Sequence, residues 1–206
     1  MVFFCAAALA QGELPARASL PDFLGEPASA EVRRTAGQAL GGGDAGGRPF
    51  AIVDKKSARL YVFHADGRLA GASAALLGLA RGDVSPPGIG QRVLSGIAPQ
   101  ERITPAGRFD SEPGRNLKGE AIVWIDYEAA VAIHRLRPAP PAERRPQRLA
   151  SDSAEDRRIS LGCVVVSAEF YDEVVAPLLG RRRGVVYVLP EMNANSIAAA
   201  ASGRQL

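Results

Sequence analysis

The stretch FAIVDKKSARLYVFHADGRLAGASAALLG, residues 50 to 78, decides the fold class of this chain. Short apolar runs alternate there with polar turns, and Asp66-Gly67 is the kind of pair that closes a β-hairpin. Alternation with a period of two places one face of each strand in a core. The stretch therefore predicts a β-meander.

The same pattern of short apolar runs separated by polar turns continues toward the C-terminus. Strand-like runs lie at residues 121–126, 130–135, 163–166 and 184–190, and the Gly- and Pro-rich residues 82–109 predict loops. Residues 167–179 predict a helix with Ser167 as N-cap, and Pro177 should kink or end it. Its apolar face is expected to consist of Phe170, Val174, Val175 and Leu178. Six or more strands against one or two helices favour a mainly β sandwich or barrel.

The N-terminal part has a different composition. Residues 1–10 contain a short apolar run and end in Ala8-Leu9-Ala10, the pattern of a signal-peptide cleavage site, although a basic n-region is missing. Residues 11–47 predict a flexible segment with a possible short helix capped by Ser29, which we expect to be a tether or peripheral element. Residues 48–191 form the main predicted domain, and residues 192–206 are expected to be a disordered tail. A cleaved signal would make the protein periplasmic or secreted, whereas an uncleaved start would favour a cytosolic thiol enzyme.

Charge and composition exclude several classes of function. The 25 basic and 22 acidic residues give a net charge of +3, too mild to argue for nucleic acid. No run reaches the roughly 18 apolar residues of a membrane-spanning helix. Two distant histidines and the single cysteine that follows the N-terminal apolar run lack the spacing of a zinc site. We therefore expect a monomer with no metal, no cofactor and no membrane span.

One thiol stands out in the predicted domain. Cys163 follows Gly162 and precedes three valines, and a glycine there lets the backbone turn and free its N–H groups. A nucleophilic thiol needs a base, for which the chain offers only His64, beside the hairpin turn, and His134, at a strand end. The alternatives are a buried, inert cysteine and a β-bulge at the glycine.

Several segments carry a resemblance to a known family. ISLGCVVV (159–166) resembles the SHGCxR signature of the L,D-transpeptidase (YkuD-like) catalytic domain, ERITPAGRF (101–109) resembles its TPxGxF segment, and residues 50–63 resemble its opening hairpin. The resemblance covers residues 50 to about 191. It implies a YkuD-like β-sandwich with one helix packed after the catalytic strand.

The resemblance also implies roles for individual residues. Cys163 takes the place of the nucleophile and His134 that of the general base. Ser160 and Gly162 take the places of the loop-shaping pair, with an oxyanion hole formed by the N–H groups around Gly162 and Cys163. The family's histidine is oriented by a backbone carbonyl or a small residue just after it, and that place is held by Arg135.

The chain departs from the signature at two positions and in one spacing. Leu161 replaces its histidine and Val165 its arginine, and His134 lies 29 positions before Cys163 because of a Pro-rich insertion at residues 138–158. The insertion predicts a lid, or alternatively a merely solvated loop. Arginines in and beside it suit the carboxylates of peptidoglycan stem peptides, with Arg135 and Arg158 as candidate binding residues; the full set is Arg135, Arg137, Arg144, Arg145, Arg148, Arg157 and Arg158.

The function implied is an exported cysteine acyltransferase that crosslinks or exchanges peptidoglycan stem peptides through a thioester on Cys163. A hydrolase on the same scaffold, either an L,D-carboxypeptidase or a crosslink hydrolase, would use water as the acceptor. Leu161 and Val165 leave open a non-catalytic cell-wall-binding protein.

Overall fold

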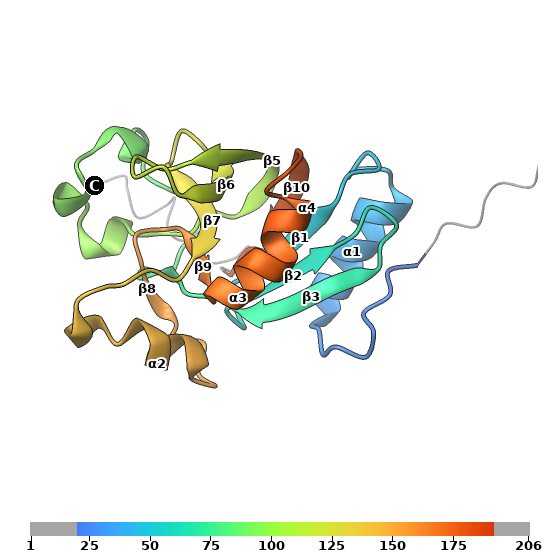
Figure 1. Cartoon of the computed structure of the whole chain (residues 1–206), viewed down its shortest axis with the longest axis horizontal. Coiled ribbons are helices and arrows are strands. Elements are labelled where there is room, and N and C mark those ends of the chain that lie inside the picture. The colour runs from blue at the N-terminus through green and yellow to red at the C-terminus, as the bar shows by residue number, and fades with distance from the viewer. Residues whose placement is uncertain (1–19, 192–206) are drawn as a thin grey trace, which may run out of the picture.

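Residues 50 to 74 form the predicted antiparallel meander. Its strands are β1 (Phe50–Asp54), β2 (Arg59–Phe63) and β3 (Leu69–Ala74), with Phe50 opposite Phe63. The turn between β2 and β3 places Gly67 at a φ of 86°, in the left-handed region that glycine tolerates best. The computed structural model describes residues 20–191 (Figure 1).

These strands belong to one mixed sheet of eight that curls into a nearly closed barrel, in the order β3-β2-β1-β10-β5-β6-β7-β9. The pairs β1–β10 and β7–β9 are parallel. A small parallel pair, β4–β8, stands apart. The remaining bounds are β4 (Leu77–Gly78), β5 (Gly107–Arg115), β6 (Ala121–Asp126), β7 (Val131–Arg135), β8 (Arg158–Ser160), β9 (Val164–Val166) and β10 (Gly184–Val188). The mainly β fold class is confirmed.

Strand β5 is long enough to pair with different neighbours along its two halves, and so links the two parts of the curled sheet. Its first part, from Gly107 to Ser111, pairs with β10, whereas Glu112 to Arg115 pair with β6. At the far end Leu76 and Val165 exchange two backbone hydrogen bonds of 2.7 and 2.9 Å, which join the chain after β3 to β9. The strand that follows Cys163 is thus held between β7 and the chain that leaves the meander.

The predicted helix after β9 is confirmed, but its buried face is shifted. It runs through α3 (Ala168–Phe170), a π-helical turn (Tyr171–Val175) and α4 (Ala176–Leu178), and the Ser167 hydroxyl accepts the Phe170 N–H at 3.1 Å. The fully buried side chains are Tyr171, Val175 and Leu179, while Phe170, Val174 and Leu178 are half-buried.

The π-helical turn explains this correction. The N–H of Ala176 donates to the carbonyl of Tyr171, five residues back, just before Pro177, which has no N–H and whose ring would crowd an α-helical carbonyl. A hydrogen bond between residues five apart, in place of the α-helical four, adds one residue to the turn. The helical faces before and after the turn are therefore rotated relative to each other. Pro177 therefore widens the helix rather than ending it.

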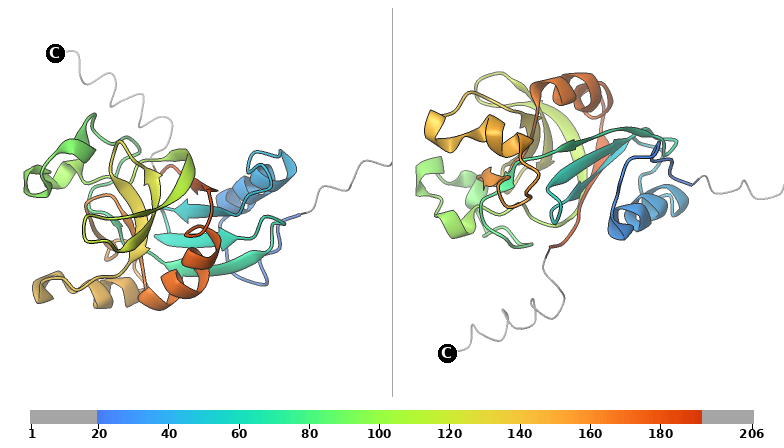
Figure 2. Two further views of the ribbon diagram at one scale, coloured as in Figure 1. Left: turned by 45° about the horizontal axis from the view of Figure 1, so that its top comes forward. Right: turned by 90° about the horizontal axis from the view of Figure 1, so that it is seen from below.

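Helix α1 (Ala30–Gly41) corrects the expectation of a tether or peripheral element. Ser29 caps it as predicted, but Val32, Ala36 and Ala39 are buried in a second core together with the stacked rings of Phe50 and Phe63. Small alanines at helical spacing let the helix lie close to an aromatic sheet face. Figure 2 shows α1 and the α3–α4 helix on opposite faces of the sheet.

The Gly-rich segment after α1 is anchored, although the sequence predicted a flexible break. The Asp44 carboxylate accepts a hydrogen bond of 2.7 Å from the Tyr187 hydroxyl and pairs with Arg108 at 2.9 Å. These contacts tie residues 42–47 to β10 and β5.

The Pro-rich segment also holds more structure than the sequence predicted. It contains a 3₁₀ turn (Pro141–Glu143) and the short helix α2 (Arg145–Ala150), neither of which buries a residue. The proposed signal remnant at residues 1–10 and the tail at 192–206 lie outside the described residues. Within residues 20–191, no helix has the length and apolar character needed to cross a bilayer.

Candidate active site

The loop before β9 holds Cys163 through a local network of hydrogen bonds. The Ser160 hydroxyl donates to the Cys163 carbonyl at 2.7 Å and accepts the N–H of Gly162 at 3.1 Å. Gly162 has a φ of 136°, and a Cβ there would lie 2.7 Å from the carbonyl oxygen of Ile103. Only glycine fits this turn without strain, as the sequence suggested.

Thr104 holds the loop through its side-chain hydroxyl. Its hydroxyl accepts the N–H of Gly78 and donates to the carbonyl of Gly162, each at 2.9 Å, and the residue is 1% exposed. The backbone carbonyl of Thr104 in turn accepts a 2.9 Å hydrogen bond from the buried ammonium of Lys55. Thr104 belongs to the Thr-Pro segment quoted above, but nothing in the sequence alone assigned it this contact.

Strand β7 places His134 on the same face of the sheet as Cys163. His134 is paired with Val165 in the parallel β7–β9 ladder, and Cys163 lies two residues before Val165, so alternation directs all three side chains to one side. The Nδ1 atom of His134 lies 2.8 Å from the carbonyl oxygen of Arg135. Since a carbonyl only accepts, Nδ1 carries the proton and Nε2 the lone pair.

Cys163 and His134 line one cavity of about 370 Å³. Ser160, Leu161 and Val165 also line it, and loop residues 89–97 and the Pro-rich segment form its walls. The Cys163 sulfur lies 3.7 Å from the carbonyl oxygen of Ala130, in the turn between β6 and β7. Both departures from the family signature, Leu161 and Val165, therefore place apolar side chains in the cavity.

Both titratable groups are neutral at pH 7. Burial is the main cause that lowers the pKa of His134 to about 4; the hydrogen bond to the Arg135 carbonyl opposes it, and the nearby Arg137 and Arg145 guanidinium groups act in the same direction as burial. Burial raises the pKa of the Cys163 thiol, whereas the Ala132 N–H and the same two arginines act in the opposite direction. The resting pair is a thiol and an imidazole, rather than a thiolate and an imidazolium.

Arg137 and Arg145 provide the cationic wall of the cavity. Arg137 forms a 2.9 Å ion pair with Glu120, and Arg145 pairs with Glu143. Both side chains are partly exposed, at 30% and 22%. They belong to the set of lid arginines recognised in the sequence, but they were not singled out there.

The two arginines that were singled out lie outside the cavity. Arg135 points to the opposite face of β7, where it pairs with Asp172 at 2.5 Å and lies over the ring of Tyr171 at 4.8 Å. Arg158 is 5% exposed and bonds to Glu191 and to the Lys55 carbonyl. Neither guanidinium can reach a ligand beside Cys163, so their expected role in substrate binding is not supported.

The oxyanion hole also differs from the expectation. The N–H of Gly162 donates to Ser160 Oγ, so it is not available to a substrate oxygen beside the Cys163 sulfur. This leaves the N–H of Cys163 itself as the backbone candidate next to the thiol.

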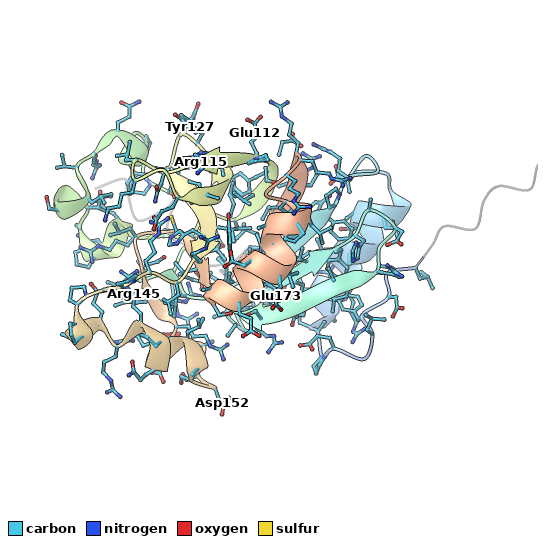
Figure 3. All side chains as sticks on the ribbon, viewed as in Figure 1. Glu112, Arg115, Tyr127, Arg145, Asp152 and Glu173 are labelled. Atoms are coloured by element: carbon cyan, nitrogen blue, oxygen red, sulfur yellow. The ribbon has the colours of Figure 1, made fainter. Side chains whose placement is uncertain are left out.

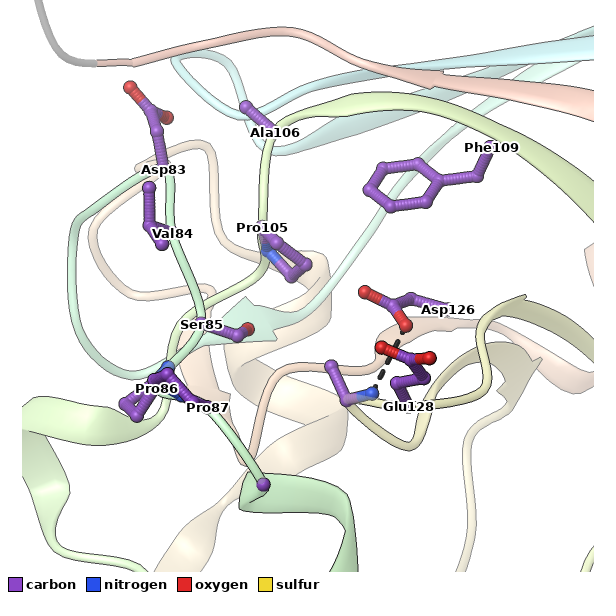
Figure 4. A pocket seen from close by; sticks show the side chains of 12 residues that line it. Asp83, Val84, Ser85, Pro86, Pro87, Pro105, Ala106, Phe109, Asp126 and Glu128 are labelled. Atoms are coloured by element: carbon purple, nitrogen blue, oxygen red, sulfur yellow. Dashed lines mark hydrogen bonds between the residues drawn. The ribbon is translucent and has the colours of Figure 1, made fainter.

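A second cavity of about 310 Å³ lies beyond the β6–β7 turn and shares Ala129 with the first. Figure 4 shows the ring of Phe109, Pro105 and the carboxylates of Asp126 and Glu128 around it. Asp126 accepts the N–H of Ala129 at 3.1 Å and so shapes the turn. Across residues 20–191, no group of three or more His, Cys, Asp or Glu side chains could hold a metal ion.

The fold and site define a mainly β protein with a thiol and a neutral imidazole in one cavity. No family model and no curated protein matches the chain. A structure of LD transpeptidase LdtMt1 in complex with imipenem is similar at 16% identity and a TM-score of 0.39, over 68% of this chain and 58% of that one. The catalytic domain from E. faecium L,D-transpeptidase is similar at 19% identity and a TM-score of 0.37, over 68% of this chain and 96% of that one.

Proposed function

We propose that this protein is an L,D-transpeptidase-like cysteine acyltransferase that acts on peptidoglycan stem peptides in the cell envelope. The observation that carries the proposal is the shared cavity of Cys163 and His134, in which the Arg135 carbonyl fixes the imidazole with Nε2 free to accept a proton. The ordered motifs of residues 50 to 191, which resemble this family, support it.

The chemistry follows from the neutral pair. As the sulfur attacks a peptide carbonyl, its proton passes to His134 Nε2, and the carbonyl oxygen takes the electron pair. When the intermediate collapses, the carbon–nitrogen bond breaks, the leaving amine takes the proton from His134, and a thioester remains on Cys163. An incoming amine then attacks the thioester, loses a proton to His134 and releases the thiol. Water in place of the amine makes the protein a hydrolase on the same site.

The charge of the cavity suits an anionic donor. Stem peptides carry carboxylates, and Arg137 and Arg145 stand where a carboxylate beside the sulfur can pair with them. They replace the cation that the family signature carries at the position of Val165. An envelope protein of this kind acts outside the cytoplasm, as the Ala8-Leu9-Ala10 pattern suggests.

The test is intact-mass analysis of the protein after incubation with a carbapenem, a β-lactam that acylates this family's cysteine. Ring opening adds the whole mass of the drug, because no group leaves. We expect one adduct on the wild type, none on Cys163→Ser, and formation about a hundred- to ten-thousandfold slower on His134→Ala. His64→Ala serves as the matched control, because it changes the other histidine.

An unmodified wild-type protein would reject the acyltransferase and favour a cell-wall-binding protein. Equal rates for wild type and His134→Ala would remove the imidazole from the mechanism. Once the adduct is seen, a stem tetrapeptide with and without an added amine separates transfer from hydrolysis.

A further inference from the structure

An exposed tyrosine ring and a partly buried tryptophan ring pack together at the end of β6, beside the candidate site. Tyr127 is 77% exposed and packs edge-on against Trp124, with ring centroids 5.1 Å apart and an angle of 66° between the planes. A Cβ on Gly114 would lie 2.5 Å from the indole, so the absence of a side chain there lets the indole lie close over β5. Trp124 and Tyr127 together form an aromatic corner, and within residues 20–191 no other aromatic ring packs against either of them.

This corner shares its sheet face with the catalytic pair. The side chains of Val123 and Ile133 enter the core, so their neighbours Trp124 and His134 lie on the opposite face. Trp124 is opposite Ala132, two residues from His134, and is therefore its diagonal neighbour across the β6–β7 pair. Since neighbouring strands are about 4.8 Å apart and β7 lies between β6 and β9, the backbones of β6 and β9 are separated by about 10 Å.

We infer that Trp124 and Tyr127 form a binding surface for a sugar ring of the glycan strand to which the stem peptide is attached. This inference deepens the proposed function and rests on it for the identity of the ligand. It adds a contact outside the cavity, to a part of the substrate that does not react.

The chemistry of the surface suits a sugar. The face of an aromatic ring carries partial negative charge, and the C–H groups of a pyranose carry partial positive charge, so the two stack. Glu112 lies opposite Trp124 in the β5–β6 ladder and Glu128 follows Tyr127 in the chain, and Figure 3 shows Glu112 and Arg115 at the same end of the molecule as Tyr127. The exposed charges at this end are of mixed sign, which suits hydroxyl groups better than a charged ligand. A substrate with an anionic peptide and an uncharged sugar thus finds a cationic wall on one side of the thiol and an uncharged aromatic corner on the other.

Trp124 is the only tryptophan of the chain, so its fluorescence reports on this surface alone. The experiment titrates the full chain carrying Cys163→Ala with a peptide-free β-1,4-linked tetramer of N-acetylglucosamine. We expect a saturable change in tryptophan emission and an affinity about tenfold weaker for Tyr127→Ala. Leu117→Ala, which removes a fully exposed side chain from the same hairpin, should stay within about twofold.

Three outcomes would overturn the inference: no saturable change with the tetramer, equal affinity of Tyr127→Ala and its parent, or a response to anionic phospholipid vesicles in place of the tetramer. The assay involves no thiol chemistry. Failure of the carbapenem adduct with intact sugar binding therefore rejects the acyltransferase, whereas an adduct without sugar binding rejects only the aromatic surface.

Discussion

Replacing Thr104 by Val should destabilise the fold and disturb the thiol at the same time. Valine has almost the shape of threonine, so the change deletes a hydroxyl without opening a large cavity. The N–H of Gly78 and the carbonyl of Gly162 then lose their partner, at a site where threonine is 1% exposed. Each buried polar group left unpaired costs about 1–3 kcal/mol, so for these two groups we expect a loss of about 2–6 kcal/mol in the free energy of unfolding.

Urea denaturation followed by circular dichroism measures this loss. With a dependence of about 2 kcal/mol per M urea, the midpoint should fall by about 1–3 M. Thr104→Ser keeps the hydroxyl and loses one methyl group, so it should cost only about 1 kcal/mol. A Thr104→Val midpoint equal to that of Thr104→Ser would refute the reasoning, because it would show that the two hydrogen bonds contribute nothing.

The same variant tests the link to the site. Gly162 precedes Cys163, and a loop that moves by about 1 Å costs about a hundredfold in rate. Carbapenem acylation of folded Thr104→Val should therefore slow by about ten- to a hundredfold, while Thr104→Ser stays close to wild type. Equal acylation rates would mean that Thr104 supports the fold alone.

Two further predictions concern the same loop and strand. Gly162→Ala places a methyl group 2.7 Å from the Ile103 carbonyl at a φ of 136°, so unfolding free energy should fall by at least about 2 kcal/mol, and an unchanged thermal midpoint would contradict the loop geometry. His134, with its pKa lowered from 6.5 to about 4, binds a proton more readily when unfolded, so its contribution is complete above pH 6.5 and is lost as the pH falls toward 4. Between pH 7 and 4.5 the wild type should lose about 2–3 kcal/mol more than His134→Gln in urea titrations, and parallel losses would refute the lowered pKa.

Local signals made much of the fold predictable. The hairpin at Asp66-Gly67, the strand at residues 121–126 and the caps at Ser29 and Ser167 each depend on contacts within a few residues, which the sequence displays directly. The core position of α1 depends instead on aromatic rings from β1 and β2. Nothing in residues 29–40 themselves reveals that partner, so the helix was predicted and its burial was missed.

The choice of binding arginines failed for a reason that the strand pattern contains. In β7 the side chains alternate, so a base at His134 places Arg135 on the other face. The next residue on the face of His134 is Leu136, which carries no charge. Arg137 reaches the cavity because the chain leaves the strand after Arg135. The alternation of side chains along the strand could have excluded Arg135 from the sequence alone. The choice of Arg137 required knowledge of the path that the chain takes after the strand.

Arg158 illustrates a limit that no pattern removes. Its guanidinium is buried with Lys55 and Glu191, and these three residues come from distant parts of the chain. A basic residue in a charged segment is most simply taken as solvated or ligand-binding. Only the tertiary structure shows that its partners are already present.

The neutral state of the pair accounts for a lone thiol in the oxidising compartment proposed for this protein. Oxidation and disulfide exchange proceed through the thiolate, and burial raises the pKa of Cys163, so little thiolate forms at rest. His134, held neutral with Nε2 free, can accept the proton only when attack on a carbonyl makes the sulfur proton acidic. Arg137 and Arg145 disfavour a cationic imidazole, but a bound carboxylate would neutralise them and so raise its proton affinity. The anionic substrate itself thereby helps to switch on the base, and a carboxylate-free substrate should react more slowly even where it binds.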